Sequence, residues 1–284
     1  MIIGGDKQPV ILNIEKAVSE QRFNDKVEVN DPSLTPAEEK ELISNFLKQK
    51  NRFSYRRKNL LARAGITLLT KGLMATTKVD GIEKIVDIET GAIVTSNHFN
   101  PLENMAVRKA ILKGQGKRLA FVSQASNLKM SGVLGFFMNY GDVIPLSAST
   151  HYMNHDFFQL LEEHLTKGHH VLIYPEQEMW FNYQKPRPVK RGPYYFAAKA
   201  QVPIISCFVE MRPLAKNDND QFKKVRYILH VLAPIYPNSS LTIEQNSRQM
   251  MDSDYQQKKQ AYEKAYGKTL TYDFEPTDIV GWRK

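Results

Sequence analysis

A histidine and a glutamate five positions apart are the residues of this sequence best suited to carry chemistry. His98 and Glu103 belong to the segment NHFNPLE (residues 97–103), which follows an apolar run and leads into a helical pattern opened by Pro101. On one regular helix the two side chains would point about 140° apart. If His98 instead precedes the helix and Glu103 sits in its first turn, the carboxylate reaches one imidazole nitrogen and raises the basicity of the other. Such a pair can deprotonate a hydroxyl nucleophile.

The same segment also has a purely structural interpretation. Asn100 and Glu103 have the spacing of a capping box, in which the glutamate only accepts hydrogen bonds from backbone N–H groups. A histidine that follows a strand is also commonly structural. The segment alone leaves both interpretations open.

The elements that would position the pair indicate an α/β fold. From about residue 78, short apolar runs alternate with helical patterns, which is typical of a sheet covered by helices. We expect a mixed, mostly parallel sheet flanked by helices. The expected strands are 92–96, 119–123, 143–146, 170–174, 204–209 and 225–232, and the expected helices are 101–113, 153–167, 193–200 and 242–266.

Three regions are expected along the chain. Residues 1–34 form a polar N-terminal arm with no assigned function, residues 35–77 a two-helix element, and residues 78–284 the α/β domain. Thr35-Pro36-Ala37-Glu38 supplies a capping box, so the first helix is expected to begin there and run to about residue 50.

The second helix of that element, about residues 55–75, has a basic amphipathic pattern. Its cations are Arg56, Arg57, Lys58 and Arg63. One interpretation places this helix in a membrane interface with these cations toward anionic lipid. The other makes it a domain face with a solvated basic rim.

Composition narrows the possible classes of protein. A chain of 284 residues can close its own core, and 39 Lys and Arg against 30 Asp and Glu favour an anionic partner. The single cysteine, Cys207, rules out an intramolecular disulfide framework and suits a reducing compartment. We find neither a leader-like segment nor an apolar stretch long enough to cross a bilayer, and therefore expect a cytoplasmic location.

The segment 97–103 resembles the first motif of the glycerolipid (lysophosphatidic acid) acyltransferase family, in which Asn-His is followed after four residues by Asp. Later blocks resemble the family in the same order. They are GFFMNYGDVIPL (135–146), Tyr174-Pro175-Glu176 where the family has Phe-Pro-Glu-Gly-Thr-Arg, KRG (190–192), AAKA (197–200) and VPII (202–205). The resemblance covers about residues 80–210 together with the paired N-terminal helices.

This resemblance implies acyl transfer from a thioester, on coenzyme A or acyl-carrier protein, to a glycerolipid hydroxyl. His98 would be the general base and Glu103 would orient it, while Asn97 and Glu176 would contact the acceptor. The alternative for Glu176 is a strand-end carboxylate that pairs with Lys185 or Arg187. The protein would be peripherally associated with a membrane and would need no cofactor beyond the thioester co-substrate.

The sequence also departs from the family pattern. Glu103 replaces aspartate, Gln177-Glu178-Met179 replaces Gly-Thr-Arg, and the second block lacks its usual arginine. Because a guanidinium is a natural clamp for a phosphomonoester, two explanations remain. Either a basic loop supplies the charge, or the acceptor lacks a phosphomonoester and is bound by other loop residues. Such an acceptor would be a glycolipid, a diacylglycerol-type lipid or a lysophospholipid with a larger headgroup, and we favour this second explanation. The loop cations are Lys185, Arg187, Lys190 and Arg191, and the loop residues are Glu178, Trp180 and Tyr183.

Other functions are less well supported by the sequence. His151 and His155 have helical i, i+4 spacing but no evident third ligand, so we expect no metal site. No phosphate-binding glycine loop and no nucleic-acid-binding module is recognisable, so we expect no nucleic-acid partner. The main alternative to an enzyme is a non-catalytic member of the same fold that binds lipid or acyl thioester.

Overall fold

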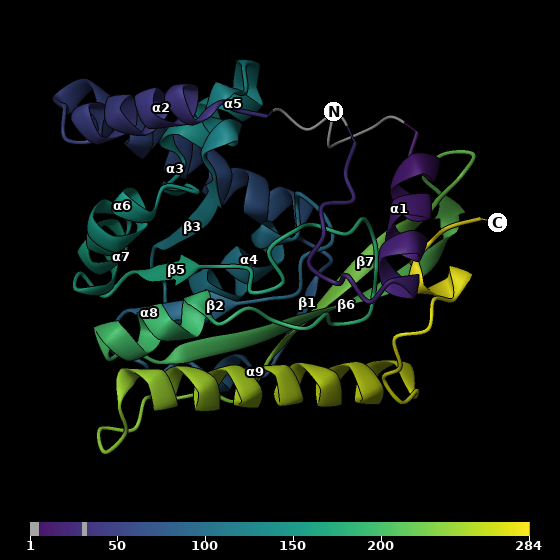
Figure 1. The fold of residues 1–284 in the computed structure, drawn as a ribbon. Helices are drawn as coiled ribbons and strands as arrows, with labels where there is room; N and C mark the ends of the chain where they lie inside the picture. The colour runs from purple at the N-terminus through teal and green to yellow at the C-terminus, as the bar shows by residue number, and fades with distance from the viewer. Residues whose placement is uncertain (1–5, 30–32, 284) are drawn as a thin grey trace.

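A computed structural model describes residues 6–29 and 33–283. In these residues seven strands form one sheet, in the order β1-β7-β6-β2-β5-β3-β4 (Figure 1). The strands are β1 (Lys78–Asp80), β2 (Ala92–Thr95), β3 (Leu119–Gln124), β4 (Val143–Leu146), β5 (His170–Leu172), β6 (Ile204–Asn217) and β7 (Lys223–Val231).

The sheet is parallel except where β7 pairs with β6 in an antiparallel hairpin. The central strands β2 and β5 are buried along their whole length, because helices cover both faces of the sheet. The expected mixed, mostly parallel α/β sheet is confirmed. Since β2 and β5 are parallel neighbours, the loops that follow them leave the same edge of the sheet.

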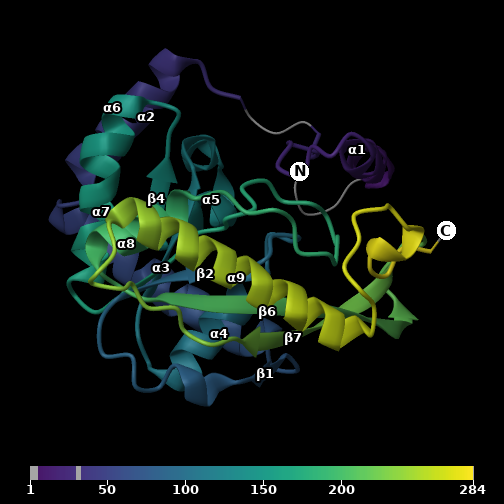
Figure 2. The same cartoon turned by 60° about the horizontal axis from the view of Figure 1, so that its bottom comes forward.

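The helices form two layers around this sheet. One face packs on α7 (Phe158–Leu165), α8 (Gly192–Ala200) and the long α9 (Ile243–Tyr266), and the other packs on α4 (Asn104–Gly114). In Figure 2 α9 runs along the sheet in front of β6. Each layer buries a continuous apolar cluster, which fixes the strand ends where the candidate site lies.

Three further helices pack beside the sheet. They are α2 (Pro36–Gln49), α3 (Phe53–Leu73) and α5 (Gly132–Tyr140). The capping box expected at Thr35 and Glu38 is present at the start of α2. Ile43 of α2 belongs to the main apolar cluster, so this helix contributes to the core of the α/β fold. In the described part of the chain no helix is both long and apolar enough to cross a bilayer.

The N-terminal arm contains a helix that the sequence reading did not assign. Helix α1 (Gln8–Ser19) buries Val10, Ile11 and Ile14 in a cluster that includes Trp180 and Ile279. Figure 1 shows α1 beside the C-terminal end of the chain. The arm therefore packs on distant segments of the chain through an apolar face.

Several element boundaries differ from the expectation. The helix expected from Pro101 begins at Asn104, because residues 101–103 form a turn. The helix expected over 153–167 begins as a π-helical turn η3 (Met153–Phe157) and continues as α7, and a short helix α6 (Thr150–Tyr152) precedes it. The three-residue strand β1 was not expected, and β6 continues to Asn217.

Candidate active site

The predicted histidine–glutamate pair is formed. His98 lies three residues beyond β2, and its Nδ1 shares a hydrogen bond with Glu103 Oε1. Glu103 is fully buried, whereas the His98 side chain is 20% exposed. The carboxylate therefore lies behind the ring and the imidazole remains partly accessible from outside. This is the geometry in which a carboxylate orients a histidine base.

The structural interpretation of Glu103 also holds. Its second oxygen, Oε2, accepts hydrogen bonds from the backbone N–H groups of Phe99 and Asn100, at 2.6 Å each. Glu103 precedes the first residue of α4 rather than lying inside the first turn. One carboxylate thus both shapes the turn and holds the imidazole, so the two interpretations do not exclude each other.

An aromatic residue fixes the plane of the His98 ring. Tyr174, which follows β5, stacks on His98 with ring centroids 3.9 Å apart and planes 8° apart. Burial, together with the negative charge of Glu103, raises the pKa of the Tyr174 hydroxyl well above its usual range. Tyr174 therefore stays neutral and confines the ring from one side.

Asn97 has a different task from the one expected. Its amide donates to the Val209 carbonyl at 3.0 Å and accepts from the Val209 N–H at 2.8 Å, and the side chain is buried. Beyond the end of β2, the Asn97 side chain thus makes with β6 the two hydrogen bonds that a strand backbone would make. It therefore anchors the His98 loop rather than contacting an acceptor.

Glu176 lies in the loop after β5 and is brought next to the His98 loop. Its Oε2 accepts from the His98 backbone N–H at 3.1 Å, and it pairs with the Arg187 guanidinium at 3.0 Å. Both side chains are at most 2% exposed. The alternative stated for Glu176, a strand-end carboxylate paired with Arg187, describes this arrangement.

The Arg187 guanidinium is fully occupied by the protein. Besides Glu176 it donates to the Phe23 carbonyl at 2.8 Å, the His98 carbonyl at 3.4 Å and the Glu178 carbonyl, and it lies over the Trp180 ring. Burial lowers the pKa of Arg187, although the charge of Glu176 opposes this effect. Arg187 holds the loop together and does not present its charge to a ligand, contrary to the expectation.

The remaining cations of this loop are also placed differently from the expectation. Lys185 is buried and pairs with Asp278 at 2.8 Å. Lys190 and Arg191 are exposed, and Arg191 pairs with Glu244 of α9. Lys185 and Arg187 therefore do not support the explanation in which a basic loop supplies the phosphate-binding charge. Both are buried in ion pairs and cannot contact a ligand.

Of the three loop residues expected to bind an altered acceptor, two are buried and one is partly exposed. Trp180 and Tyr183 are buried in the cluster under α1, so they pack the loop. Of these three residues only Glu178 is partly exposed, and its carboxylate accepts a hydrogen bond from the Gln124 side chain at 3.1 Å. Gln177 adopts the left-handed conformation, with φ 68°, at the position of the family glycine. Gln177 therefore adopts a backbone conformation that glycine adopts more readily than other residues.

Three residues that support this loop carry no sequence motif and were not predicted. Residues 23–25, here called the N-terminal clasp, lie against it. Asn24 Nδ2 donates to the carbonyls of Glu176 and Pro188, at 3.2 and 2.9 Å, and the Asp25 carbonyl accepts from Trp180 Nε1 at 2.9 Å. Backbone acceptors from a distant segment leave no motif in a sequence.

The cations assigned to a membrane surface lie on α3. Arg56, Arg57 and Lys58 are exposed, whereas Arg63 lies 3.6 Å from the buried carboxylate of Asp142. Helix α3 also exposes large apolar side chains, and α5, which packs against it, adds more. These side chains are Phe53, Leu60, Leu61, Leu68, Val133 and Leu134, between 43 and 77% exposed.

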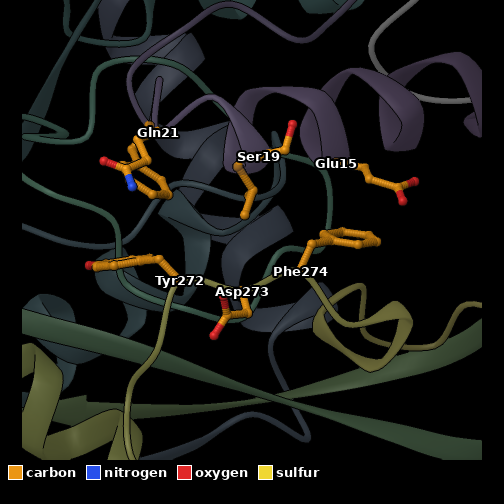
Figure 3. A pocket seen from close by; sticks show the side chains of 8 residues that line it. Glu15, Ser19, Gln21, Tyr272, Asp273 and Phe274 are labelled. Atoms are coloured by element: carbon orange, nitrogen blue, oxygen red, sulfur yellow. The ribbon is translucent and has the colours of Figure 1, made fainter.

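Other chemistry-bearing residues do not join the site. His151 and His155 lie with ring centroids 4.8 Å apart, but the described residues contain no cluster that could hold a metal ion. Cys207 is fully buried, and burial raises the pKa of its thiol to about 12. A cavity of about 600 Å³ between α1 and Tyr272 is lined by none of the site residues predicted from the sequence (Figure 3).

The site is thus an oriented histidine at the carboxyl edge of a mostly parallel, helix-covered sheet. Residues 76–210 match the Acyltransferase family model, and the segment contains His98, Glu103 and Glu176. Over these residues the chain is similar to the Acyltransferase family, in agreement with the resemblance seen in the motifs. A comparison with curated proteins found no match.

One solved structure similar to this chain is the 1-acyl-sn-glycerophosphate (LPA) acyltransferase PlsC from Thermotoga maritima. The two share 16% sequence identity with a TM-score of 0.48, and the match covers 82% of this chain and 90% of that chain.

Proposed function

We propose that this protein transfers a fatty acyl group from a thioester, on coenzyme A or acyl-carrier protein, to the hydroxyl of a glycerolipid at a membrane surface. The observation that carries the proposal is the buried Glu103 carboxylate bonded to Nδ1 of the partly exposed His98. The family match of residues 76–210 supports the type of reaction.

The proposed reaction follows from the orientation of His98. With Nδ1 bonded to Glu103, the other ring nitrogen accepts the proton of the lipid hydroxyl. The hydroxyl oxygen attacks the thioester carbonyl, a C–O bond forms, and the C–S bond breaks as the tetrahedral intermediate collapses. The proton held by His98 then passes to the leaving thiolate. The products are the acylated lipid and a free thiol, and no further cofactor is needed.

The surface of α3 supports a membrane location for the reaction. Leu60, Leu61 and Leu68 are exposed among the cations Arg56, Arg57 and Lys58. Each buried leucine favours an apolar environment by about 1.5–3 kcal/mol, and each cation near an anionic surface adds about 1 kcal/mol. A lipid acceptor would then reach the site from the bilayer.

The experiment is a free-thiol release assay with acyl-CoA and acyl-carrier-protein donors. Lysophosphatidate, other lysophospholipids and glycolipids are offered in parallel. We expect release with one acceptor class from the wild type and none from His98→Ala. The matched control is His155→Ala, since His155 is exposed and outside the site. Its release should equal that of the wild type.

Two outcomes would overturn the proposal. Turnover retained in a folded His98→Ala variant would remove the base from the mechanism. Silence across the whole panel, from folded wild-type protein that binds lipid vesicles, would instead favour the non-catalytic lipid-binding interpretation.

A further inference from the structure

A buried ion pair on α9 has no part in the proposed reaction as described so far. Asp254 and Lys258 lie one helical turn apart, their side chains are at most 1% exposed, and Lys258 Nζ lies 2.7 Å from Asp254 Oδ2. Both residues lie outside residues 76–210, the part of the chain that matches the family model. A buried ion pair contributes little net stability compared with apolar side chains of similar volume. What the pair does for the molecule therefore depends on the groups that it holds.

The first group is the hydroxyl of Thr95, the last residue of β2. It lies 3.0 Å from each oxygen of the Asp254 carboxylate, to which it donates, and it accepts from Lys258 Nζ at 2.9 Å. His98 follows three residues later, and Asn97, just before it, is bonded to β6. The chain that leads to His98 is therefore fixed by two side chains, and one of these is held by α9.

The second group is the hydroxyl of Tyr194 in the first turn of α8. It donates to Asp254 Oδ2, and burial together with the charge of Asp254 raises the pKa of Tyr194 well above its usual range, so the hydroxyl stays a donor. Helix α8 directly follows the loop that carries Glu176. The two ends of this loop lie side by side, because the Lys190 N–H donates to the Pro175 carbonyl at 2.8 Å.

The two segments held by Asp254 meet at the base. Glu176 Oε2 accepts from the His98 backbone N–H at 3.1 Å, so the loop before α8 contacts the loop after β2 at this residue. Four side chains, here called the α9 network, join the ends of these two loops. They are Thr95, Tyr194, Asp254 and Lys258. A displacement of about 1 Å from a change far from the reacting atoms can cost about 10²-fold in rate.

We propose that Asp254 and Lys258 are positioning residues, which hold Thr95 and Tyr194 so that His98 keeps the geometry needed for acyl transfer. They touch no substrate and act only through the two loops. This proposal rests on the proposed acyl transfer and adds α9 to the machinery that supports it. Apolar side chains would fill the same space, but they would not fix the directions of the two hydroxyls, because only hydrogen bonds are directional.

The first test compares two buried tyrosines. Tyr194→Phe takes one donor from Asp254, whereas Tyr262→Phe, the matched control, removes a buried hydroxyl of α9 that has no hydrogen-bond partner among the described residues. In the thiol-release assay Tyr194→Phe should lower kcat about 3- to 10-fold with KM unchanged, and Tyr262→Phe should leave both constants unchanged. Equal kinetics in the two variants would show that the network does not position the base.

The second test separates positioning from stability. One variant replaces the whole network by apolar residues, through Thr95→Val, Tyr194→Phe, Asp254→Leu and Lys258→Met. Because all partners are removed together, the Tm should stay within about 5 °C of the wild type or rise, while kcat falls about 10- to 100-fold. Thr95→Val alone should also lower kcat, and Thr95→Ser, which keeps the hydroxyl, should restore at least half of it.

Two results of this second test would overturn the proposal. Retention of kcat within twofold of the wild type by the folded apolar variant would make the network dispensable for catalysis. A kcat as low in Thr95→Ser as in Thr95→Val would show that the hydroxyl is not what holds the loop. If the apolar variant does not fold, the two tyrosine variants and the two Thr95 variants decide.

A third measurement does not depend on turnover. The imidazole N–H resonance of His98, identified in the NMR spectrum by its loss in His98→Ala, reports the bond to Glu103. It should shift or broaden in Tyr194→Phe and stay in place in Tyr262→Phe. If the wild type releases no thiol but this difference is seen, the proposed reaction fails while the positioning role stands. If the resonance is the same in both tyrosine variants, the positioning role is wrong.

Discussion

Replacing Glu103 by glutamine separates its two tasks. The carboxylate accepts three hydrogen bonds, from His98 Nδ1 and from the N–H groups of Phe99 and Asn100. A glutamine has the same shape but only one accepting oxygen. If that oxygen keeps the two backbone donors, the amide NH₂ group faces Nδ1, and the ring must carry its proton on the outer nitrogen. A histidine in that tautomer cannot accept the proton of a hydroxyl.

The size of the effect follows from this geometry. Loss of a positioned general base costs about 10²- to 10⁴-fold in kcat. A charge-assisted hydrogen bond is roughly twice as strong as a neutral one, and a neutral one contributes about 1 kcal/mol. Because two backbone bonds become neutral in Glu103→Gln, the free energy of unfolding should fall by about 2 kcal/mol.

The assay combines thiol release with urea unfolding. Glu103→Asp keeps the charge but shortens the side chain by one methylene, so its kcat should lie between those of Glu103→Gln and the wild type. Glu89→Gln is the matched control, because its side chain is exposed and it precedes β2, at the opposite edge of the sheet from His98. If Glu103→Gln loses stability as expected but keeps kcat within threefold of the wild type, the glutamate only shapes the turn, and the reasoning is refuted.

Three further predictions concern the surface, the loop and the pH response. Leu60→Glu should weaken binding to anionic vesicles at least tenfold in a sedimentation assay, whereas Leu12→Glu on α1, which is equally a surface change, should not. Arg187→Met should cost about 3–5 kcal/mol in urea unfolding, because it strands a buried carboxylate, while Lys190→Met should cost almost nothing. Burial lowers the pKa of His164 to about 4, so the unfolded chain binds more protons below about pH 6.5, and stability should fall as the pH drops from 6.5 to 4. Chemical unfolding of His164→Gln should show a smaller fall over that range; an unchanged slope would contradict the assignment.

The sheet was largely predictable because its central strands are apolar runs buried on both faces. Strand β4 matches the expected range of residues 143–146, since it is a short apolar run whose first three residues are buried. Strand β1 was missed because its three residues are mostly exposed and carry no apolar pattern. Helix α1 was missed because its apolar face becomes meaningful only against distant partners such as Trp180.

The site shows the same limit. His98 and Glu103 could be paired from the sequence because they are five residues apart and a turn joins them. The burial of Lys185 and Arg187 could not be predicted from the sequence. Their partners, Asp278 for Lys185 and Phe23 for Arg187, lie far away along the chain. A basic run in a sequence indicates charge but not whether that charge is already neutralised.

The N-terminal clasp makes the folding unit longer than the segment that matches the family. Asn24 bonds to Glu176 and Pro188 across 152 and 164 residues of chain, and Phe23 and Asp25 accept from the same loop. A fragment limited to residues 76–210 would leave the Trp180 indole and the Arg187 guanidinium without these acceptors. Contacts between segments so distant in sequence form late in folding, because closing a long loop costs entropy before the contact is gained. The geometry around His98 is therefore completed only when the beginning of the chain returns to its middle.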